Sequence, residues 1–133
     1  MYFSDIHWVA LISSLFIYMI VGALWYSPLL FGEVWRNAMG FRPEKLTPTN
    51  KAWVGAVFNA LVTAYGLSVL ISFSGAENGM EGMKVAFFAW LGISATGHFG
   101  SVLWENRPVK VFFIHAGCML VTLLSMGFVL GGF

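Results

Sequence analysis

Well inside the apolar stretches of this 133-residue chain, the side chains able to do chemistry are Tyr18, Tyr65, His98, His115 and Cys118. Imidazole is the most versatile of these groups, because it changes charge near neutral pH and its neutral form is a common ligand of metals and haem. An ionisable residue inside a membrane span is a candidate functional residue by default, although polar side chains also hold helices together. The two histidines are therefore the starting point for a function.

His98 and His115 lie equally far along the sequence from the centre of the turn at residues 106–107. In an antiparallel helical hairpin, equal spacing places the two rings at equal depth, about 9 Å inside the boundary at a rise of 1.5 Å per residue. Counting inward from the same boundary places Tyr18 and Asn59 near that depth. The sequence therefore predicts a buried polar layer of Tyr18, Asn59, His98 and His115.

Three functions are open for this layer. It can be a cluster of hydrogen bonds between helices, since buried polar groups must find partners. It can be a permeation or small-molecule site, with histidines that change charge near neutral pH. It can also hold haem or a metal between His98 and His115, with Cys118 and Met119 close by as soft ligands. The hydrogen-bond cluster is the simplest of the three, so we expect no metal and no other cofactor.

No catalytic arrangement accompanies the layer. The sequence has no nucleophile and general base within plausible reach, no phosphate-binding glycine loop and no pair of carboxylates. Carboxylates, which commonly form proton relays inside membranes, are absent from the long apolar stretches. We therefore expect that the protein is not an enzyme.

The composition is that of a protein surrounded by lipid. Hydrophobic residues make up 59% of the chain and charged residues only 10%, whereas about 25% of the residues of a soluble domain are charged. A small soluble fold needs more polar residues than this to cover its surface. The net charge of +1 gives no basic footprint for a nucleic acid. The lipid bilayer is the expected environment.

The apolar residues fall into segments long enough to cross a bilayer, which takes about 20 helical residues. The segments are about 6–26, 52–73, 85–104 and 111–133, and none contains Asp, Glu, Lys or Arg. Between the first two, residues 31–40 show the helical periodicity of a short amphipathic helix lying on the membrane. We predict an all-α integral membrane four-helix bundle, with residues 1–133 forming one transmembrane domain.

Basic residues in the loops predict the orientation of the bundle. Between the second and third segments there is only Lys84, whereas the other two loops carry Arg36, Arg42, Lys45, Lys51, Arg107 and Lys110. Because short loops rich in Lys and Arg stay in the cytoplasm, we expect these two loops to be cytoplasmic. Both termini then face outward from a bacterial inner membrane.

The second segment carries a small residue at every fourth position, namely Ala52, Ala56, Ala60, Ala64, Ser68 and Ser72. Small side chains let helix backbones approach closely, which is the main attraction between helices in lipid. Our leading hypothesis is thus a non-catalytic protein that acts through helix packing, as a homo-oligomer or as an accessory subunit of a membrane complex. The alternative is a small oligomeric channel or transporter with a histidine-lined polar layer.

A distinctive motif runs through the end of the first segment and the following loop: Gly22, Trp25, Tyr26, Pro28, Phe31, Gly32 and Trp35. With Glu105 and Arg107 after the third segment, it resembles a bacterial membrane family filed as domain of unknown function 1761. The resemblance spans the whole chain and implies a four-helix membrane protein, without an activity. From the residues alone, we interpret Trp25, Tyr26 and Trp35 as an interfacial aromatic belt, with a ligand cleft as the alternative. Glu105 and Arg107 are interpreted as an interfacial ion pair, with a docking point for an anionic lipid as the alternative.

The predicted orientation is tested by reporter fusions at either end of the chain in a bacterial host. A reporter that is active only outside the cytoplasm is expected to be active at both ends, and a cytoplasmic reporter to be inactive at both. Activity of the cytoplasmic reporter at either end would contradict the orientation, while leaving the number of spans untouched.

Overall fold

The computed structural model describes residues 8–27, 30–39 and 50–132. These residues form helices and turns, and no strand occurs among them. The helices are α1 (Trp8–Trp25), α2 (Gly32–Met39), α3 (Asn50–Ser74), α4 (Gly79–Ala89), a π-helical segment (Trp90–Ala95), α5 (Thr96–Trp104) and α6 (Val109–Gly132).

Four of these helical stretches are long and apolar enough to cross a membrane: α1, α3, the continuous stretch Gly79–Trp104 and α6. The prediction of an all-α, membrane-spanning four-helix bundle is thereby confirmed, and α2 is the short helix expected at 31–40. Several sequence-based assignments lie outside the described residues, including Pro28, Arg42, Lys45 and the outer ends of the first and fourth segments.

The third span starts at Gly79, six residues before its predicted start at Val85. The reason is a cap. The Asn78 side chain accepts a hydrogen bond from the Glu81 backbone N–H at 3.0 Å, and the Glu81 carboxylate accepts one from the Glu77 N–H at 2.6 Å. The first bond satisfies a free N–H group of the first helical turn, and the second holds the chain just before the helix, so polar residues that read as loop belong to the helix.

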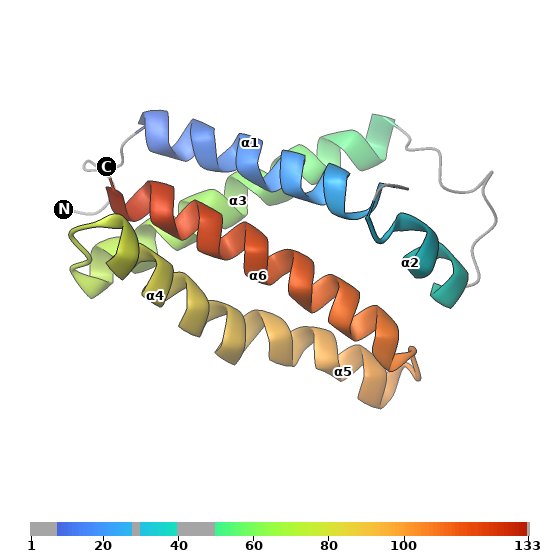
Figure 1. Ribbon diagram of the computed structural model, residues 1–133. Helices are drawn as coiled ribbons and strands as arrows, with labels where there is room; N and C mark the ends of the chain where they lie inside the picture. Colours follow the sequence, from blue (N-terminus) through green and yellow to red (C-terminus); the bar gives the residue numbers. More distant parts are fainter. Residues whose placement is uncertain (1–7, 28–29, 40–49, 133) are drawn as a thin grey trace.

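α6 lies in the middle of the bundle (Figure 1), with α1 on one side, α4 and α5 on the other, and α3 crossing behind. The start of α1 and the end of α6 lie at one end of the bundle. The α1–α2 turn and the α5–α6 turn lie at the other end, which the sequence predicts to be cytoplasmic.

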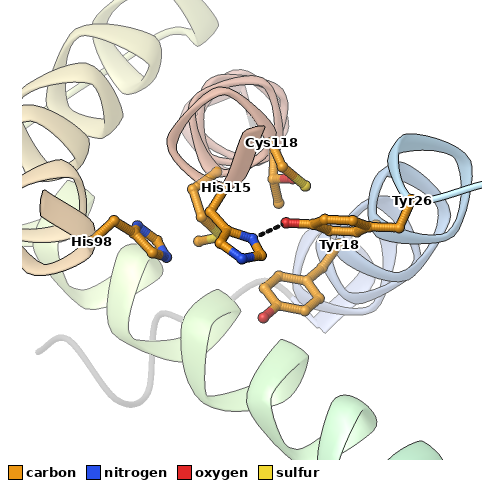
Figure 2. A pocket seen from close by; sticks show the side chains of 8 residues that line it. Tyr18, Tyr26, His98, His115 and Cys118 are labelled. Carbon is orange, nitrogen blue, oxygen red and sulfur yellow. Dashed lines mark hydrogen bonds between the residues drawn. The ribbon is translucent and has the colours of Figure 1, made fainter. Parts of the chain in front are cut away.

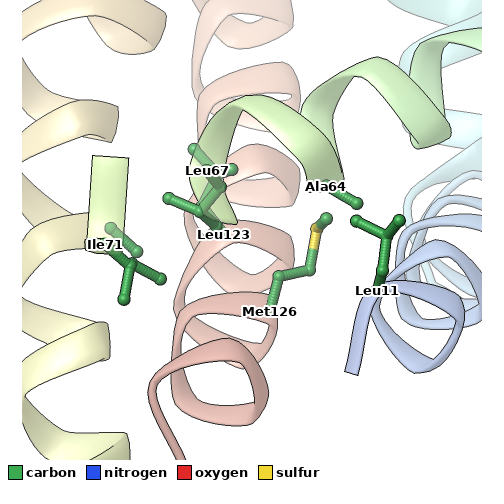
Figure 3. Close-up of a cluster of buried hydrophobic side chains, with 7 residues drawn as sticks. Leu11, Ala64, Leu67, Ile71, Leu123 and Met126 are labelled. Atoms are coloured by element: carbon green, nitrogen blue, oxygen red, sulfur yellow. The ribbon is translucent and has the colours of Figure 1, made fainter. Parts of the chain in front are cut away.

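The apolar core gathers where α1, α3, α4 and α6 meet. Figure 3 shows most of its side chains, and the buried members are Leu11, Ala64, Leu67, Ile71, Ala86, Leu123 and Met126. α3 contributes to this core through buried residues at steps of four, three and four, namely Ala60, Ala64, Leu67 and Ile71.

The predicted ladder of small residues on α3 therefore holds only in its middle. Ala60 and Ala64 are fully buried, but Ala52 and Ser72 are exposed, and Ala56 and Ser68 are half-buried. Each four-residue step overshoots one helical turn by about 40°, so a ladder of six residues winds around the helix. Only a mixed three- and four-residue spacing stays on one face, which is why the ladder leaves the core at both ends.

Glycines bring α4 close to the half of α6 that ends at Gly132. A Cβ atom added to Gly82 would collide with the Gly127 carbonyl oxygen, and one added to Gly131 would lie 2.6 Å from the Asn78 carbonyl oxygen. Neither backbone leaves room for a side chain here. This glycine contact supplies the dense packing that holds membrane helices together in the absence of a hydrophobic drive between them.

Replacing Gly82 with leucine is expected to destabilise the bundle, because the new side chain forces α4 away from α6. Overpacking of this kind typically costs about 1–3 kcal/mol. The matched control is Gly97→Leu in α5, where an added Cβ has nothing within 4 Å. The measurement is the thermal unfolding temperature of both variants in the same mild detergent. Equal unfolding temperatures for Gly82→Leu and Gly97→Leu would contradict the close contact between α4 and α6.

Candidate functional site

A cavity of about 190 Å³ lies between α1, α5 and α6 (Figure 2). Its lining is Tyr18, Gly22, Tyr26, His98, His115, Cys118, Met119 and Thr122. At roughly 30 Å³ per water molecule, a space of this size holds about six waters or one small solute. Most of the lining side chains carry a polar group, although much of the surface that they present to the cavity is carbon.

Helical spacing explains how two spans aim polar residues at one cavity. On the α1 side, Tyr18, Gly22 and Tyr26 follow one another at steps of four. On α6, His115 and Thr122 are seven residues apart, which is nearly two helical turns. Residues at such spacings share one face of a helix, so both helices present a polar stripe to the space between them.

His115 lies at the centre of the contacts within the cavity. The Tyr26 hydroxyl and His115 Nδ1 share a hydrogen bond. The other side of the ring stacks on His98, with ring centroids 5.8 Å apart and planes inclined by 23° (Figure 2). His98 Nδ1 is buried and has no hydrogen-bond partner among the described residues. One imidazole is thus anchored, and the other keeps a buried nitrogen without a partner among the described residues.

The π-helical segment Trp90–Ala95 brings His98 to this position. Gly82 packs against α6, and Trp90 Nε1 donates a hydrogen bond to the Ala116 carbonyl oxygen of α6 at 2.7 Å. In an uninterrupted α-helix, His98 would face about 160° away from Gly82. The wider turns of a π-helix rotate the following residues back toward α6. The irregular segment is therefore what lets the histidines of two spans meet.

Aromatic residues of the motif close the end of the cavity nearer the α1–α2 turn. Trp25 Nε1 donates to the Ile114 carbonyl oxygen at 2.9 Å. The Trp35 ring of α2 lies edge-on to Tyr26, at 5.2 Å between centroids, and 6.4 Å from His115. These rings are not only interfacial. Tyr26 lines the cavity and Trp35 packs against two of its residues. These contacts agree with the alternative interpretation from the sequence, in which the aromatic residues form a ligand cleft.

Two glycines let these aromatic residues come close. A Cβ added to Gly32 would collide with the Tyr26 carbonyl oxygen and lie 2.7 Å from that of Ser27, so only glycine fits where α2 folds back against the end of α1. A Cβ added to Gly117 would lie 3.1 Å from Trp25 Cζ2, which shows that the indole rests on α6. Phe31 packs on Trp25, with ring centroids 4.7 Å apart.

The structure brings together three of the four residues of the predicted polar layer: Tyr18, His98 and His115. The prediction for Asn59 is wrong, because its side chain is exposed on α3 and does not line the cavity. Its depth follows from the sequence, but its direction around the helix does not. The sequence analysis also missed Thr122 and Gly22 in the lining. Steps of four from Tyr18 and of seven from His115 are the signal that finds them.

The geometry of the two histidines bears on a metal or haem site. In the described part of the chain, no three side chains of His, Cys, Asp or Glu gather closely enough to hold a metal ion. Two axial haem ligands point their nitrogens at one iron from opposite sides. The rings of His98 and His115 are nearly parallel, with their centroids 5.8 Å apart.

Glu105 and Arg107 form an ion pair in the turn after α5, with Arg107 Nε 3.0 Å from Glu105 Oε2. Between them, Asn106 has a φ of 56°, a left-handed conformation that asparagine tolerates better than most residues. The backbone N–H of Arg107 then donates to the Ser101 carbonyl oxygen at 3.2 Å, which ends the helix. Both side chains are exposed, so they belong to the turn and not to the cavity.

Removing the Tyr26 hydroxyl is expected to destabilise the protein, because its hydrogen bond to His115 is lost. The expected cost of Tyr26→Phe is about 0.5–1.5 kcal/mol. Tyr18→Phe is the control, since the Tyr18 hydroxyl forms no hydrogen bond within the described part of the chain. Denaturation of both variants in the same micelles compares their free energies of unfolding. An equal or larger loss in Tyr18→Phe would contradict the assigned bond.

A comparison with curated proteins and one with solved structures find no match to this chain. Residues 9–131 match the model of a family described as protein of unknown function (DUF1761). Because the match spans nearly the whole chain, the protein belongs to this family.

Proposed function

We propose that the protein binds a small, uncharged, hydrogen-bonding solute in the cavity between α1, α5 and α6. We further propose that the cavity is the central part of a path for this solute across the bilayer. The observation that carries the proposal is a cavity between apolar spans whose lining includes two phenols and two imidazoles, one of which, His98, also keeps a buried nitrogen without a partner among the described residues. Buried polar atoms are nearly always paired, so a hydrogen-bonding occupant completes the site.

The chemistry of the lining favours an uncharged solute. Its polar groups are two phenols, two imidazoles, a thiol and a hydroxyl, and none is a carboxylate, an ammonium or a guanidinium group. A permanently charged solute would have no counterion there, and an unpaired charge is costly inside a membrane. Hydroxyl groups and neutral imidazoles both donate and accept hydrogen bonds, which suits water, ammonia, urea or a small polyol.

Polar side chains also extend the path away from the cavity. Ser14, one turn before Tyr18 on α1, is fully buried, and its hydroxyl has no partner among the described residues. Thr122, which lines the cavity, is also buried on α6. At the opposite end, Trp35 packs over Tyr26 and His115. Passage between the cavity and that end therefore requires α2 to move its indole ring aside.

A second function, action through helix packing as a homo-oligomer or accessory subunit, draws on a different surface. The glycines of α4 and α6 are used inside the bundle, so they do not offer a face to a partner. The exposed side of α3 does, as argued below. Both functions are non-catalytic and both operate within the lipid bilayer, for which we retain the predicted bacterial inner membrane.

The proposal is tested by filling the cavity. Gly22→Leu places a side chain in it, and an added Cβ at Gly22 meets nothing within 4 Å, so the helices need not move apart. In proteoliposomes exposed to gradients of urea, glycerol or ammonia, and to osmotic shock for water, the wild type is expected to speed the equilibration of at least one solute. Gly22→Leu is expected to lower that rate at least about tenfold, an added barrier of only 1.4 kcal/mol.

Gly97→Leu is the matched control, because it adds the same side chain to an exposed position of α5. It is expected to leave the rate unchanged, whereas replacing His98 and His115 together with alanine is expected to change it. Two results would overturn the proposal. One is a wild-type rate equal to that of protein-free vesicles for all four solutes, and the other is an unaltered rate in Gly22→Leu.

A further inference from the structure

Asn59 is a polar side chain that α3 exposes on the outside of the bundle. It lies nine residues after the start of a 25-residue helix, or about 14 Å along it at a rise of 1.5 Å per residue. This depth places the amide among the hydrocarbon chains of the bilayer. Asn59 makes no hydrogen bond within the described part of the chain. An amide that lacks a hydrogen-bond partner in lipid costs free energy. We therefore expect Asn59 to bind a partner from outside the bundle.

The residues around Asn59 form a face suited to another helix. Gly55, Asn59, Val62 and Gly66 follow one another at steps of four, three and four, and all four are exposed. A Cβ added to Gly55 or Gly66 meets nothing within 4 Å. A spacing of this kind repeats every seven residues, which is the pattern of helices that cross at about 20°. We call these four residues the Asn59 face.

The Asn59 face is separate from the part of α3 that holds the bundle together. Ala60, Ala64, Leu67 and Ile71 turn toward the core, and Ala64 lies about 140° around the helix from Asn59 at 100° per residue. The cavity also lies elsewhere, because none of its lining residues belongs to α3. A partner on the Asn59 face would therefore leave both the core and the cavity in place.

We propose that two copies of the protein pair through α3, with the two Asn59 amides hydrogen-bonded to each other across a two-fold axis along the membrane normal. The amide is self-complementary, since it has an accepting oxygen and a donating nitrogen. In a two-fold pair each residue meets its own counterpart. Two copies inserted in the same direction bring Asn59 to the same depth, and the glycines on either side let the backbones approach. A single asparagine at such a position also fixes the register of a helix pair.

The pairing is tested by cross-linking the full chain in vesicles of mixed phosphatidylethanolamine and phosphatidylglycerol. Cys118, the only cysteine, is first replaced by alanine. Val62→Cys then places a thiol on the Asn59 face, and Val57→Cys is the matched control. Val57 is also exposed, but it lies about 160° around the helix from Asn59. Mild oxidation is expected to give a disulfide-linked dimer with Val62→Cys and not with Val57→Cys.

The amide itself is tested by Asn59→Leu and Asn59→Gln. Interhelical hydrogen bonds in membranes are worth about 0.6–2 kcal/mol, so Asn59→Leu is expected to raise the dimer dissociation constant about 3- to 30-fold. Asn59→Gln keeps the amide and is expected to retain most of the affinity. The readout is energy transfer between labelled copies as lipid dilutes the protein.

Gly66→Leu is expected to weaken the dimer through its bulk, whereas Gly97→Leu on α5 leaves it unchanged. A wild type that stays monomeric at every dilution would overturn the proposal. Equal cross-linking at positions 57 and 62 would do the same, as would a dimer that is indifferent to Asn59→Leu. None of these results bears on solute binding, so the two proposals fail separately.

Discussion

A polar group inside a bilayer has no water to bond, so each one must find its partner within the protein or carry the cost of lacking it. α6 supplies much of what this bundle needs. The indoles of Trp25 and Trp90 donate to its Ile114 and Ala116 carbonyl oxygens, and His115 on the same helix bonds Tyr26. These bonds come from opposite sides of α6, and they tie α1 and the third span to one central helix.

The same helix is packed differently at its two ends. Near its end at Gly132, Gly82 and Gly127 bring the backbones of α4 and α6 into contact. Toward the other end, large polar side chains stand between α6 and its neighbours, and the space that they leave is the cavity. The interior is therefore dense at the end with the tight glycine contact, and it is open at the end where aromatic and imidazole rings separate the helices.

The depth of each residue was predictable from the sequence, but its direction was not. Length, hydropathy and the spacing around one turn placed His98 and His115 at the same level, and the structure stacks their rings. Asn59 was assigned to the inward side of its helix, whereas the structure exposes it. In water, a helix has one apolar face that marks the core. In lipid, the outward face is apolar as well, so little in α3 distinguishes the inward side.

Local irregularities of the helices, such as the π-helical segment, could not be predicted from the sequence either. The π-helical segment before Thr96 changes which residues of the third span face α6, and no residue type announces such a segment. The motif around Trp25, by contrast, is recognisable in the sequence, but the contacts of its aromatic residues with α6 are visible only in the fold. Trp25 and Tyr26 form hydrogen bonds with residues of α6 that lie about ninety residues further along the chain.

The central claim is that a polar cavity between α1, α5 and α6 is completed by something other than protein. A high-resolution density map of the protein purified with its native lipids tests this most directly. The account predicts ordered non-protein density in the cavity, within hydrogen-bonding distance of the Tyr18, His98 or His115 side chain. A cavity filled by the chain's own side chains, with no such density, would contradict it.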